Sequence, residues 1–224
     1  DFTANVSHEL KTPLTSISGY AELIETGIAK PADVPEFGRK IHVEASRMIQ
    51  LVNDILQLSH LDNVSETGAA PAMETVDLLD VARECVERQK VNARPSYISL
   101  TYLGESAPGT GSRVLLDELC QNLCDNAIRY NRPGGKVQII TACTRDGHCT
   151  LTVKDNGIGI PKEAQTSVFE RFYRVDKSRS KATGGTGLGL AIVKHIARIH
   201  NARIKLYSVV DEGTTLPVSF ETAA

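Results

Sequence analysis

The chain has 224 residues, 41% of them hydrophobic and 23% charged, the balance of a globular protein with one large domain or two small ones. Its 25 Lys and Arg residues against 27 Asp and Glu residues give a net charge of -2, so the composition indicates no surface for nucleic acid. No apolar run approaches the roughly 20 residues that span a bilayer, and no signal peptide is visible. Because the chain begins at Asp1, without a methionine and directly in a helical pattern, we expect a fragment of a longer protein.

The first part of the chain has the pattern of two long amphipathic helices. Residues 2–29 carry apolar side chains spaced by threes and fours. After Gly27 and a loop around Pro31 and Pro35, a second stripe follows; it consists of Phe37, Ile41, Met48, Leu51, Ile55 and Leu58. We therefore expect an antiparallel helical hairpin over residues 1–62. A lone hairpin cannot enclose a core, so two hairpins should pack into a four-helix bundle, which predicts a homodimer.

His8 is unusual in the first predicted helix because it falls roughly opposite the apolar stripe, on the same outer side as Thr12. Pro13 cannot donate a hydrogen bond to the carbonyl of Glu9, at a cost of roughly 3 kcal/mol in a helix interior. An exposed imidazole acts as a nucleophile if a base takes the proton from its other ring nitrogen, and Glu9 is the candidate base. The alternative is that His8 is a solvated surface residue.

This segment, V-S-H-E-L-K-T-P-L-T-S-I, resembles the H box of sensor histidine kinases. The resemblance implies that His8 takes the phosphoryl group. It also implies that Thr12 serves in removing phosphate from the partner protein. We expect Pro13 to bias Thr12 away from ideal helical geometry and to free its hydroxyl from bonding to the carbonyl four residues earlier. The alternative for Thr12 is a solvated helix residue.

Beyond a linker at 63–75, which is small, polar and rich in turn residues, the pattern of residues 76–224 is mixed α and β. Helices are expected at about 77–93, 112–130 and 188–200. Strands are expected at about 97–103, 136–144, 148–155, 203–209 and 215–221. The sequence therefore predicts a two-domain chain, a helical hairpin followed by an α/β domain.

The five cysteines form no C-x-x-C pair; they are Cys85, Cys120, Cys124, Cys143 and Cys149. Cys120 and Cys124 share a helix face without making a metal-ligand set. We expect all five to be small buried hydrophobic residues in a reducing cytoplasm.

Three segments of the second domain carry candidate ligand-binding residues. In D-E-L-C-Q-N-L-C-D-N-A-I-R-Y-N, Asn122 and Asn126 lie one helical turn apart, and carboxamide oxygens suit Mg²⁺. Arg129 and Tyr130 follow on the next turn, within reach of phosphate oxygens. Alone, such an asparagine pair is usually solvent-facing or capping.

The second segment is V-K-D-N-G-I-G-I-P, in which Asp155 ends a strand and Gly157 and Gly159 permit a tight turn. A carboxylate there can accept a hydrogen bond from an adenine amino group, although in isolation the stretch reads as a hairpin turn.

The third segment, G-G-T-G-L-G-L-A-I-V-K-H-I, opens a helix with a glycine run that exposes backbone N–H groups to anions. Its glycines are Gly184, Gly185, Gly187 and Gly189. The spacing matches neither the dinucleotide-binding motif nor the Walker loop.

In this order the three segments resemble the N, G1 and G2 boxes of the histidine-kinase ATP-binding domain, and V-F-E-R-F-Y-R-V-D resembles its F box. The resemblance covers essentially the whole chain. It implies a dimeric four-helix bundle followed by an α/β sandwich of the type shared with DNA gyrase and the heat-shock chaperone. The implied ligands are ATP and Mg²⁺.

The resemblance also implies residue roles. Asn126 would hold Mg²⁺, Asn122 would support the phosphates and Asp155 would read adenine. A lid at about 161–187 would cover the phosphates, and its Arg174 would reach the γ-phosphate. The remaining nucleotide contacts would be Arg129, Tyr130, Gly157, Gly159, Gly185, Gly187, Leu188 and Gly189.

The chain departs from the family pattern in places. Ser112 stands where the family often has Asp, and we expect it to cap the N-box helix equally well. Arg129 replaces a frequent Lys and keeps the charge. The H-N-A-R-I and D-E-G-T-T segments are poorer in glycine than usual, which affects local hairpin geometry.

The leading interpretation is an ATP-dependent protein-histidine kinase that passes the phosphoryl group from His8 to an aspartate of a response regulator and also acts as its phosphatase. Membrane contact would come only through segments absent from this chain, the cytoplasmic part of a membrane-anchored bacterial sensor kinase. An ATPase is disfavoured because Asn122 cannot act as a base and Glu118 lies a turn away. A degenerate, non-enzymatic dimeric scaffold is the third alternative, and the intact Asn126, Asp155 and G2 glycines argue against it.

Overall fold

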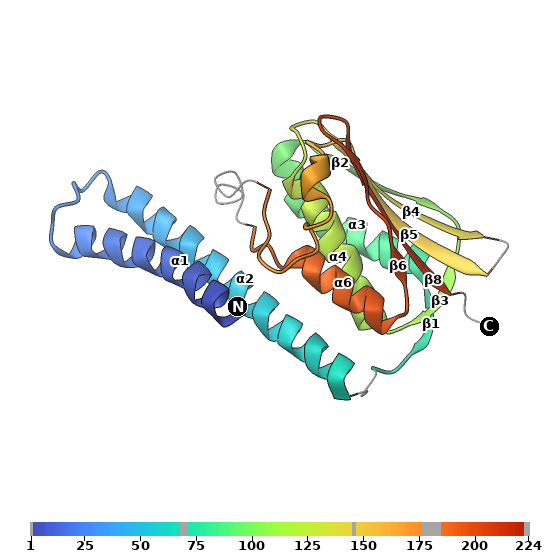
Figure 1. Cartoon of the computed structure of the whole chain (residues 1–224). Helices are drawn as coiled ribbons and strands as arrows, with labels where there is room; N and C mark the ends of the chain where they lie inside the picture. Colours follow the sequence, from blue (N-terminus) through green and yellow to red (C-terminus); the bar gives the residue numbers. More distant parts are fainter. Residues whose placement is uncertain (1, 68–70, 145–146, 176–184, 222–224) are drawn as a thin grey trace.

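The computed structural model describes residues 2–67, 71–144, 147–175 and 185–221 of the chain. Two long helices, α1 (Phe2–Glu25) and α2 (Val34–Thr67), form the predicted antiparallel hairpin. Figure 1 shows the connected end of this hairpin projecting away from the α/β domain, while the start of α1 and the second half of α2 lie beside it. Helix α1 continues through Pro13, the buried residue of this helix, because its ring removes only one donor from the hydrogen-bond ladder.

The second helix is longer at both ends than the sequence pattern predicted. Pro35 lies in its first turn, where a missing N–H group costs nothing, rather than in the preceding loop. At the other end, residues 63–67 continue the helix into the stretch expected to be linker. Strand β1 then begins at Glu74. The domain boundaries themselves stay a prediction.

The α/β domain contains a large sheet with the strand order β2-β4-β5-β8-β6, in which β7 also pairs with β8. Its strands are β2 (Ser99–Gly104), β4 (Lys136–Thr144), β5 (His148–Asp155), β6 (Arg203–Ile204), β7 (Tyr207–Val209) and β8 (Gly213–Glu221). All pairs are antiparallel except β2 with β4. The strand expected at 203–209 is split into β6 and β7, because Lys205 and Leu206 leave the regular ladder.

A second, two-stranded sheet was not predicted. It pairs β1 (Glu74–Asp77) with β3 (Pro108–Gly111) in antiparallel register. Each strand has only four residues, too few for an alternating pattern to be recognised. Asp77 explains the position of the following helix, because its side chain accepts a hydrogen bond from the Leu79 N–H as an N-cap.

Three helices cover one face of the large sheet (Figure 1). They are α3 (Leu78–Ala93), α4 (Arg113–Arg129) and α6 (Gly189–Ile199); short 3-10 turns occur at Arg94–Ser96 and Lys162–Ala164. The core lies between helices and sheet, where Leu119, Ile192 and Val218 are fully buried. Burial of each such side chain contributes about 1.5–3 kcal/mol. The two-domain fold class is therefore confirmed for the single chain.

Ser112 occupies the N-cap position of α4, but its side chain makes no capping hydrogen bond, contrary to expectation. Its backbone N–H instead donates to Nε2 of His200 at 3.0 Å. The site is buried, and the imidazole takes the place of a capping partner.

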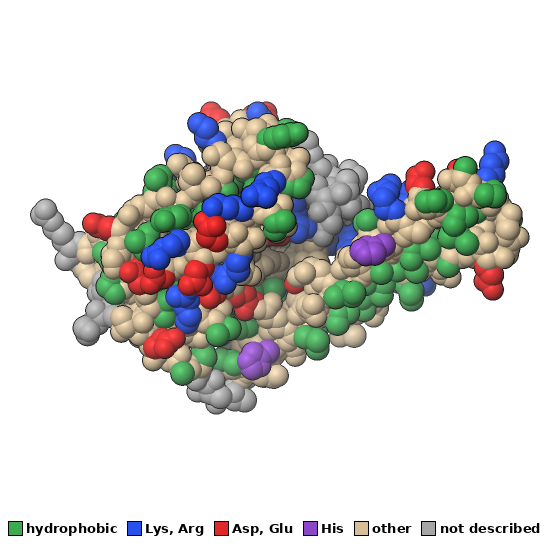
Figure 2. All heavy atoms as spheres, turned by 180° about the vertical axis from the view of Figure 1, so that it is seen from behind, with side chains coloured by type: hydrophobic (Ala, Val, Ile, Leu, Met, Phe, Trp, Pro, Cys, Tyr) green, Lys and Arg blue, Asp and Glu red, His purple; other side chains and the backbone are tan. Residues whose placement is uncertain are grey.

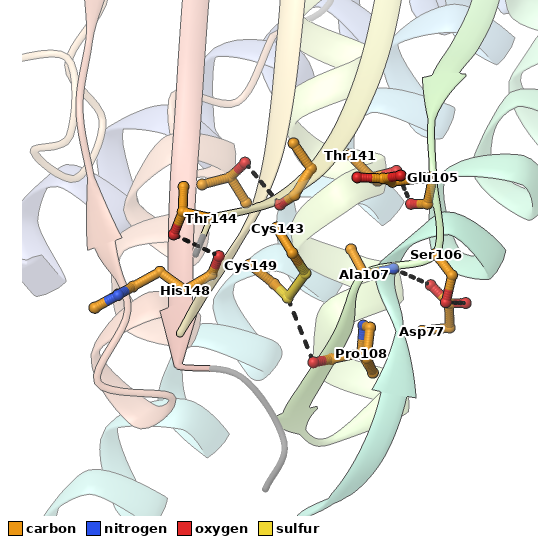
Figure 3. The surroundings of a disulfide bond; sticks show 12 residues. Asp77, Glu105, Ser106, Ala107, Pro108, Thr141, Cys143, Thr144, His148 and Cys149 are labelled. Carbon is orange, nitrogen blue, oxygen red and sulfur yellow. Dashed lines mark hydrogen bonds between the residues drawn. A yellow bond between two sulfur atoms is a disulfide. The ribbon is translucent and has the colours of Figure 1, made fainter. Parts of the chain in front are cut away.

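The expectation that all cysteines are free was wrong for two of them. Cys143 and Cys149 form a disulfide between β4 and β5, with Cα atoms 4.2 Å apart, and Figure 3 shows the bridge beside Pro108 of β3. The two residues lie directly opposite each other in the ladder, so their sulfur atoms meet without any change of the backbone. Cys85, Cys120 and Cys124 are free and buried, as expected.

Candidate functional site

A pocket of about 1060 Å³ opens between α2, α4, the end of β5 and the start of α6. It collects most of the residues that the sequence placed at a nucleotide: Asn122, Asn126, Arg129, Tyr130, Asp155, Gly159, Arg174, Gly185, Gly187 and Gly189. Gly157 and Leu188 are not part of its lining, and neither is any of His8, Glu9 and Thr12. Gly184 and residues 176–184 of the expected lid lie outside the described residues.

Asn122 and Asn126 face the start of α6. A side chain at Gly189 would place its Cβ 3.1 Å from Oδ1 of Asn122 and 3.5 Å from Nδ2 of Asn126. Glycine at this position therefore lets the first turn of α6 approach the amides of α4. The Asn122 amide also donates to the carbonyl of Glu118 at 3.1 Å, which orients it.

Arg129 and Tyr130 lie near the other end of the glycine loop, which we define as residues 185–189. A Cβ at Gly185 would lie 3.0 Å from the Tyr130 hydroxyl and 3.6 Å from Nη1 of Arg129. Arg129 is held by an ion pair with Asp125 at 2.7 Å. The loop thus runs past a cation and a hydroxyl, both suited to an anionic ligand.

Asp155 sits at the end of β5 and is fixed by two backbone donors. Its Oδ1 atom accepts hydrogen bonds from the N–H groups of Gly157 at 2.8 Å and Thr214 at 3.3 Å. Burial raises the pKa of this carboxyl group, and the two hydrogen bonds oppose that shift. Gly159 adopts a φ of +68°, and a side chain there would collide with the carbonyl of Val209, so the turn requires glycine.

The phosphoacceptor candidate lies on the hairpin. His8 is exposed on α1, whereas Glu9 is half-buried. The Glu9 carboxylate accepts a hydrogen bond from Nη2 of Arg174 at 2.9 Å and lies 4.0 Å from Nη2 of Arg47. Arg174 is nearly buried and also donates to the carbonyl of Thr186 at 3.0 Å. Arg174 therefore joins the histidine-bearing helix to the loop that contains Thr186.

The expectation that Pro13 frees the Thr12 hydroxyl from bonding to the carbonyl four residues earlier was wrong. Its hydroxyl donates to the backbone carbonyl of His8 at 3.3 Å, which is the bond to the residue four positions earlier that Pro13 was expected to prevent. Pro13 removes the donor for the carbonyl of Glu9, not of His8, and α1 stays helical on both sides. The Thr12 side chain therefore keeps its ordinary helical partner.

The sequence analysis missed one residue of the pocket wall, Asp54, and considered another, Glu118, only as a distant base. Asp54 of α2 is buried, and its Oδ2 accepts a hydrogen bond from the hydroxyl of Thr186 at 2.6 Å. Glu118 of α4 also faces the pocket, where burial and then the charge of Asp54 raise its pKa to about 7. A carboxylate inside the apolar stripe of α2, between Leu51 and Leu58, is the sequence signal that marked Asp54.

The pocket suits a metal that brings most of its own ligands. The part of the chain that the structure describes holds no group of three or more His, Cys, Asp or Glu side chains that could bind a metal ion. What it offers is carboxamide oxygen on α4, the donor that Mg²⁺ accepts while keeping waters and phosphate oxygens. The donor set thus fits a nucleotide-bound Mg²⁺.

Two family models match the chain. Residues 1–64 match the His Kinase A (phospho-acceptor) domain. Residues 111–223, half of the chain, match the histidine kinase-, DNA gyrase B- and HSP90-like ATPases. The chain belongs to the sensor histidine kinase family. Its second domain is an ATP-binding domain of that family, and its hairpin is a phosphoacceptor domain.

Among relatives, the sensor-like histidine kinase SenX3 of Mycolicibacterium smegmatis is 44% identical over 98% of this chain and 56% of its own length. The sensor protein kinase WalK of Staphylococcus saprophyticus is 40% identical over 96% of this chain and 35% of its own length. The chain thus spans about a third to half of the length of these sensor kinases.

A solved structure of the histidine kinase ThkA in complex with the response regulator protein TrrA has the same fold, with a TM-score of 0.76 at 21% identity. The match covers 99% of this chain and 61% of that one. Within the described residues of the present chain, no helix is long and apolar enough to cross a membrane.

Proposed function

We propose that this histidine kinase core transfers the γ-phosphoryl group of ATP to His8 and from there to an aspartate of a response regulator. The observation that carries the proposal is one pocket that combines the N-box amides, Asp155 and the glycine loop, next to a hairpin that exposes His8. Phosphoryl transfer depends on positioning and charge neutralisation, which amides, cations and backbone N–H groups supply.

In this proposal Asp155 accepts a hydrogen bond from the adenine amino group, because its carboxylate is fixed at the pocket wall. Gly157 and Gly159 shape the turn beside the base. Arg129, Tyr130 and the loop from Gly185 to Gly189, including Leu188, contact the phosphates, while Asn122 supports them. Asn126 would hold Mg²⁺, which when bound neutralises phosphate charge.

At His8, one ring nitrogen forms a bond to the γ-phosphorus as the bond from that phosphorus to the ADP oxygen breaks. Glu9 takes the proton from the other ring nitrogen. In the described structure Glu9 is engaged by Arg174, and His8 lies outside the pocket lining. Transfer therefore requires the Glu9–Arg174 ion pair to open, which frees Arg174 for the γ-phosphate.

The hairpin supports a homodimer. Large apolar side chains are exposed along it, including Leu14 at 55%, Val43 at 54%, Ile49 at 63% and Leu56 at 63%. Figure 2 shows hydrophobic side chains gathered along the length of the hairpin. A second copy packed on this surface would complete a four-helix bundle. We further propose that the chain is the cytoplasmic part of a membrane-anchored bacterial sensor kinase, as its longer relatives suggest.

The test is incubation with γ-labelled ATP followed by acid and alkali treatment of the labelled protein. Phosphohistidine is labile to acid and stable to alkali, so the label should be lost only in acid. His8→Gln should abolish labelling and leave ATP binding intact, because nucleophile and nucleotide sit in different domains. His60→Gln, another exposed histidine of the hairpin, is the matched control and should label normally.

Acid-labile label in His8→Gln would show that another histidine is the acceptor, and His42, His148, His195 and His200 would follow. The same assay measures free phosphate. Phosphate release that continues unchanged in His8→Gln would instead favour an ATPase, with Glu118 as the base that Asn122 cannot be.

A further inference from the structure

Asp54 brings a negative charge from the helical hairpin into the wall of the nucleotide pocket. It lies on α2 in the buried stripe between Leu51 and Leu58 and is only 7% exposed. A lone buried carboxylate is costly unless donors surround it. Two donors do so: the Gln50 amide at 2.6 Å on Oδ1 and the Thr186 hydroxyl at 2.6 Å on Oδ2. The geometry is that of an ionised acid acting as acceptor twice.

One of the two donors to Asp54, the Thr186 hydroxyl, belongs to the glycine loop. Thr186 lies between Gly185 and Gly187, and its hydroxyl accepts a further hydrogen bond from the N–H of Leu188 at 3.3 Å. The Thr186 hydroxyl is thus turned toward α2, and the Leu188 N–H is turned toward that hydroxyl. Both are groups of the kind that a phosphate uses at a helix start.

The charge of Asp54 also acts on side chains of α4 that line the pocket. Burial raises the pKa of Asp54 above its ordinary value, and the hydrogen bonds from Thr186 and Gln50, followed by the charge of Arg129, the cation proposed to contact phosphate, oppose that shift. The pKa of Glu118 on α4 is raised by burial and, next, by the charge of Asp54. The carboxylate therefore acts on both a cation and an acid that line the same cavity.

We propose that Asp54 is a specificity-determining residue of the nucleotide site: it engages the Thr186 hydroxyl of the glycine loop and opposes bound nucleotide in proportion to the phosphate charge of that nucleotide. The inference rests on the proposed function, because it presumes that a nucleotide binds in this pocket. Repulsion between like charges across a few ångströms of protein is large enough to change affinity about tenfold.

A consequence is that nucleotide binding and docking of the hairpin oppose each other. If Asp54 bonded to Thr186 weakens the binding of phosphate, then bound phosphate weakens the Asp54–Thr186 contact by the same factor. ATP would therefore loosen α2 from the glycine loop more than ADP does. The contact of the hairpin with the loop would therefore depend, through Asp54, on the number of phosphates of the bound nucleotide.

The experiment measures dissociation constants of ATP, ADP and adenosine for the whole chain by calorimetry, with EDTA and separately with Mg²⁺. Asp54→Asn keeps the shape and can still bond to Gln50 and Thr186, but it removes the charge. In EDTA we expect ATP to bind about tenfold more tightly to this variant, ADP about threefold and adenosine equally. Asp54→Ser serves as the second neutral variant if the first fails to fold.

Asp62→Asn is the matched control. Asp62 lies two turns further along α2 and binds Arg171 of the ATP-binding domain at 2.8 Å, but it does not line the pocket. This variant should leave the ratio of ATP to adenosine affinity unchanged. An unchanged or weaker ATP affinity in Asp54→Asn would overturn the inference. A loss seen only with Mg²⁺ would overturn it in favour of a metal-binding Asp54. If the unaltered chain binds neither ATP nor ADP, the proposed function itself fails.

Discussion

Arg174 and Glu9, which are 165 positions apart in the sequence, form an ion pair at 2.9 Å that joins the ATP-binding domain to the helix that carries His8. Arg174 simultaneously donates to the carbonyl of Thr186. The pair keeps the proposed base occupied and engages the side chain that is proposed to contact the γ-phosphate. In the proposed mechanism, phosphoryl transfer to His8 and this contact between the domains therefore exclude each other.

Glu9→Gln tests the base. The amide keeps the size of the side chain and can still bond to Arg174, but it cannot take a proton from His8. We expect labelling of His8 to slow by about 10²- to 10⁴-fold while the affinity for ATP stays within a factor of two. The measurement is the initial rate of label incorporation. Glu44→Gln, which removes a carboxylate 4.0 Å from Arg47, is the control and should label at the normal rate. A Glu9→Gln rate equal to that of the control would remove Glu9 from the mechanism.

Substitutions of Asn126 and Asp155 should affect nucleotide affinity differently in the presence and absence of Mg²⁺. Asn126→Ala is expected to weaken ATP binding about tenfold with Mg²⁺ and little with EDTA, because its oxygen acts through the metal. Asp155→Asn is expected to weaken binding of ATP and of adenosine with or without metal, since it loses an acceptor at the base. Titrations of both variants under both conditions decide the point. Equal losses of ATP affinity for both variants, with and without Mg²⁺, would mean that the two roles are assigned wrongly.

The Cys143–Cys149 bridge should stabilise the α/β domain without affecting the nucleotide. It closes a short loop, for which constraint of the unfolded chain is worth about 2 kcal/mol. The double variant Cys143→Ser, Cys149→Ser should therefore unfold at a lower temperature, while its ATP affinity is unchanged because Asp155 lies at the far end of β5. A reductant should lower the unfolding temperature of the unaltered chain and leave that of the variant unchanged.

Thiol titration of the unfolded chain tests the bridge independently: we expect three thiols before reduction and five after it. Five at the outset would show that the bridge is absent.

The hairpin and the strands on both sides of the disulfide were predictable from the sequence because each depends on local spacing. Most of the nucleotide pocket was implied by the family resemblance, since no single segment of it indicates a shared site. The bridge itself was missed although its signal was present. Strands at 136–144 and 148–155 joined by a short turn place residues 143 and 149 opposite each other, but periodicity alone does not state the register. The expectation that all five cysteines are free was wrong because it considered cysteine spacing and not the pairing of the strands.

Contacts between the domains were not predictable in the same way. Asp54 interrupts an apolar stripe, which marks it as unusual, but its partner Thr186 is 132 positions away. The same holds for Arg171, which reaches Asp62 across 109 positions. Such pairs depend on how two units pack, and no pattern within either unit encodes it.

His200 should make the stability of the α/β domain depend on pH. It is buried; its Nδ1 lies 2.8 Å from the carbonyl of Ile196, and its Nε2 accepts from the Ser112 N–H. Burial lowers its pKa below the ordinary value of 6.5. The folded state then binds fewer protons than the unfolded state just below pH 6.5, so the free energy of unfolding falls as the pH falls through that range, by at most about 1.4 kcal/mol per pH unit.

His200→Gln removes the titrating group while its side-chain oxygen can still accept from Ser112. Urea unfolding at pH 7.5, 6.5 and 5.5 should show a smaller loss of stability for this variant than for the unaltered chain. Part of the pH dependence of the free energy of unfolding should remain in both proteins, because burial also lowers the pKa of His195. Parallel curves for the two proteins would show that His200 does not titrate in this range.

For Thr12 the structure contradicts the expected geometry of the hydroxyl, while the expected role in dephosphorylation stays a prediction. Its hydroxyl donates to the carbonyl of His8 at 3.3 Å, a long bond that leaves both oxygen lone pairs free to accept from a water molecule. Located one turn after His8, it can orient a water toward a phospho-aspartate docked at the histidine. We expect Thr12→Ala to slow dephosphorylation of the cognate regulator about tenfold or more, while labelling of His8 stays within a factor of two. Thr15→Ala is the matched control, because Thr15 is exposed and bonds in the same way to the carbonyl of Lys11 at 2.8 Å. Equal effects of the two substitutions, or a parallel fall in both activities of Thr12→Ala, would assign the result to helix α1 and not to a separate role of this hydroxyl.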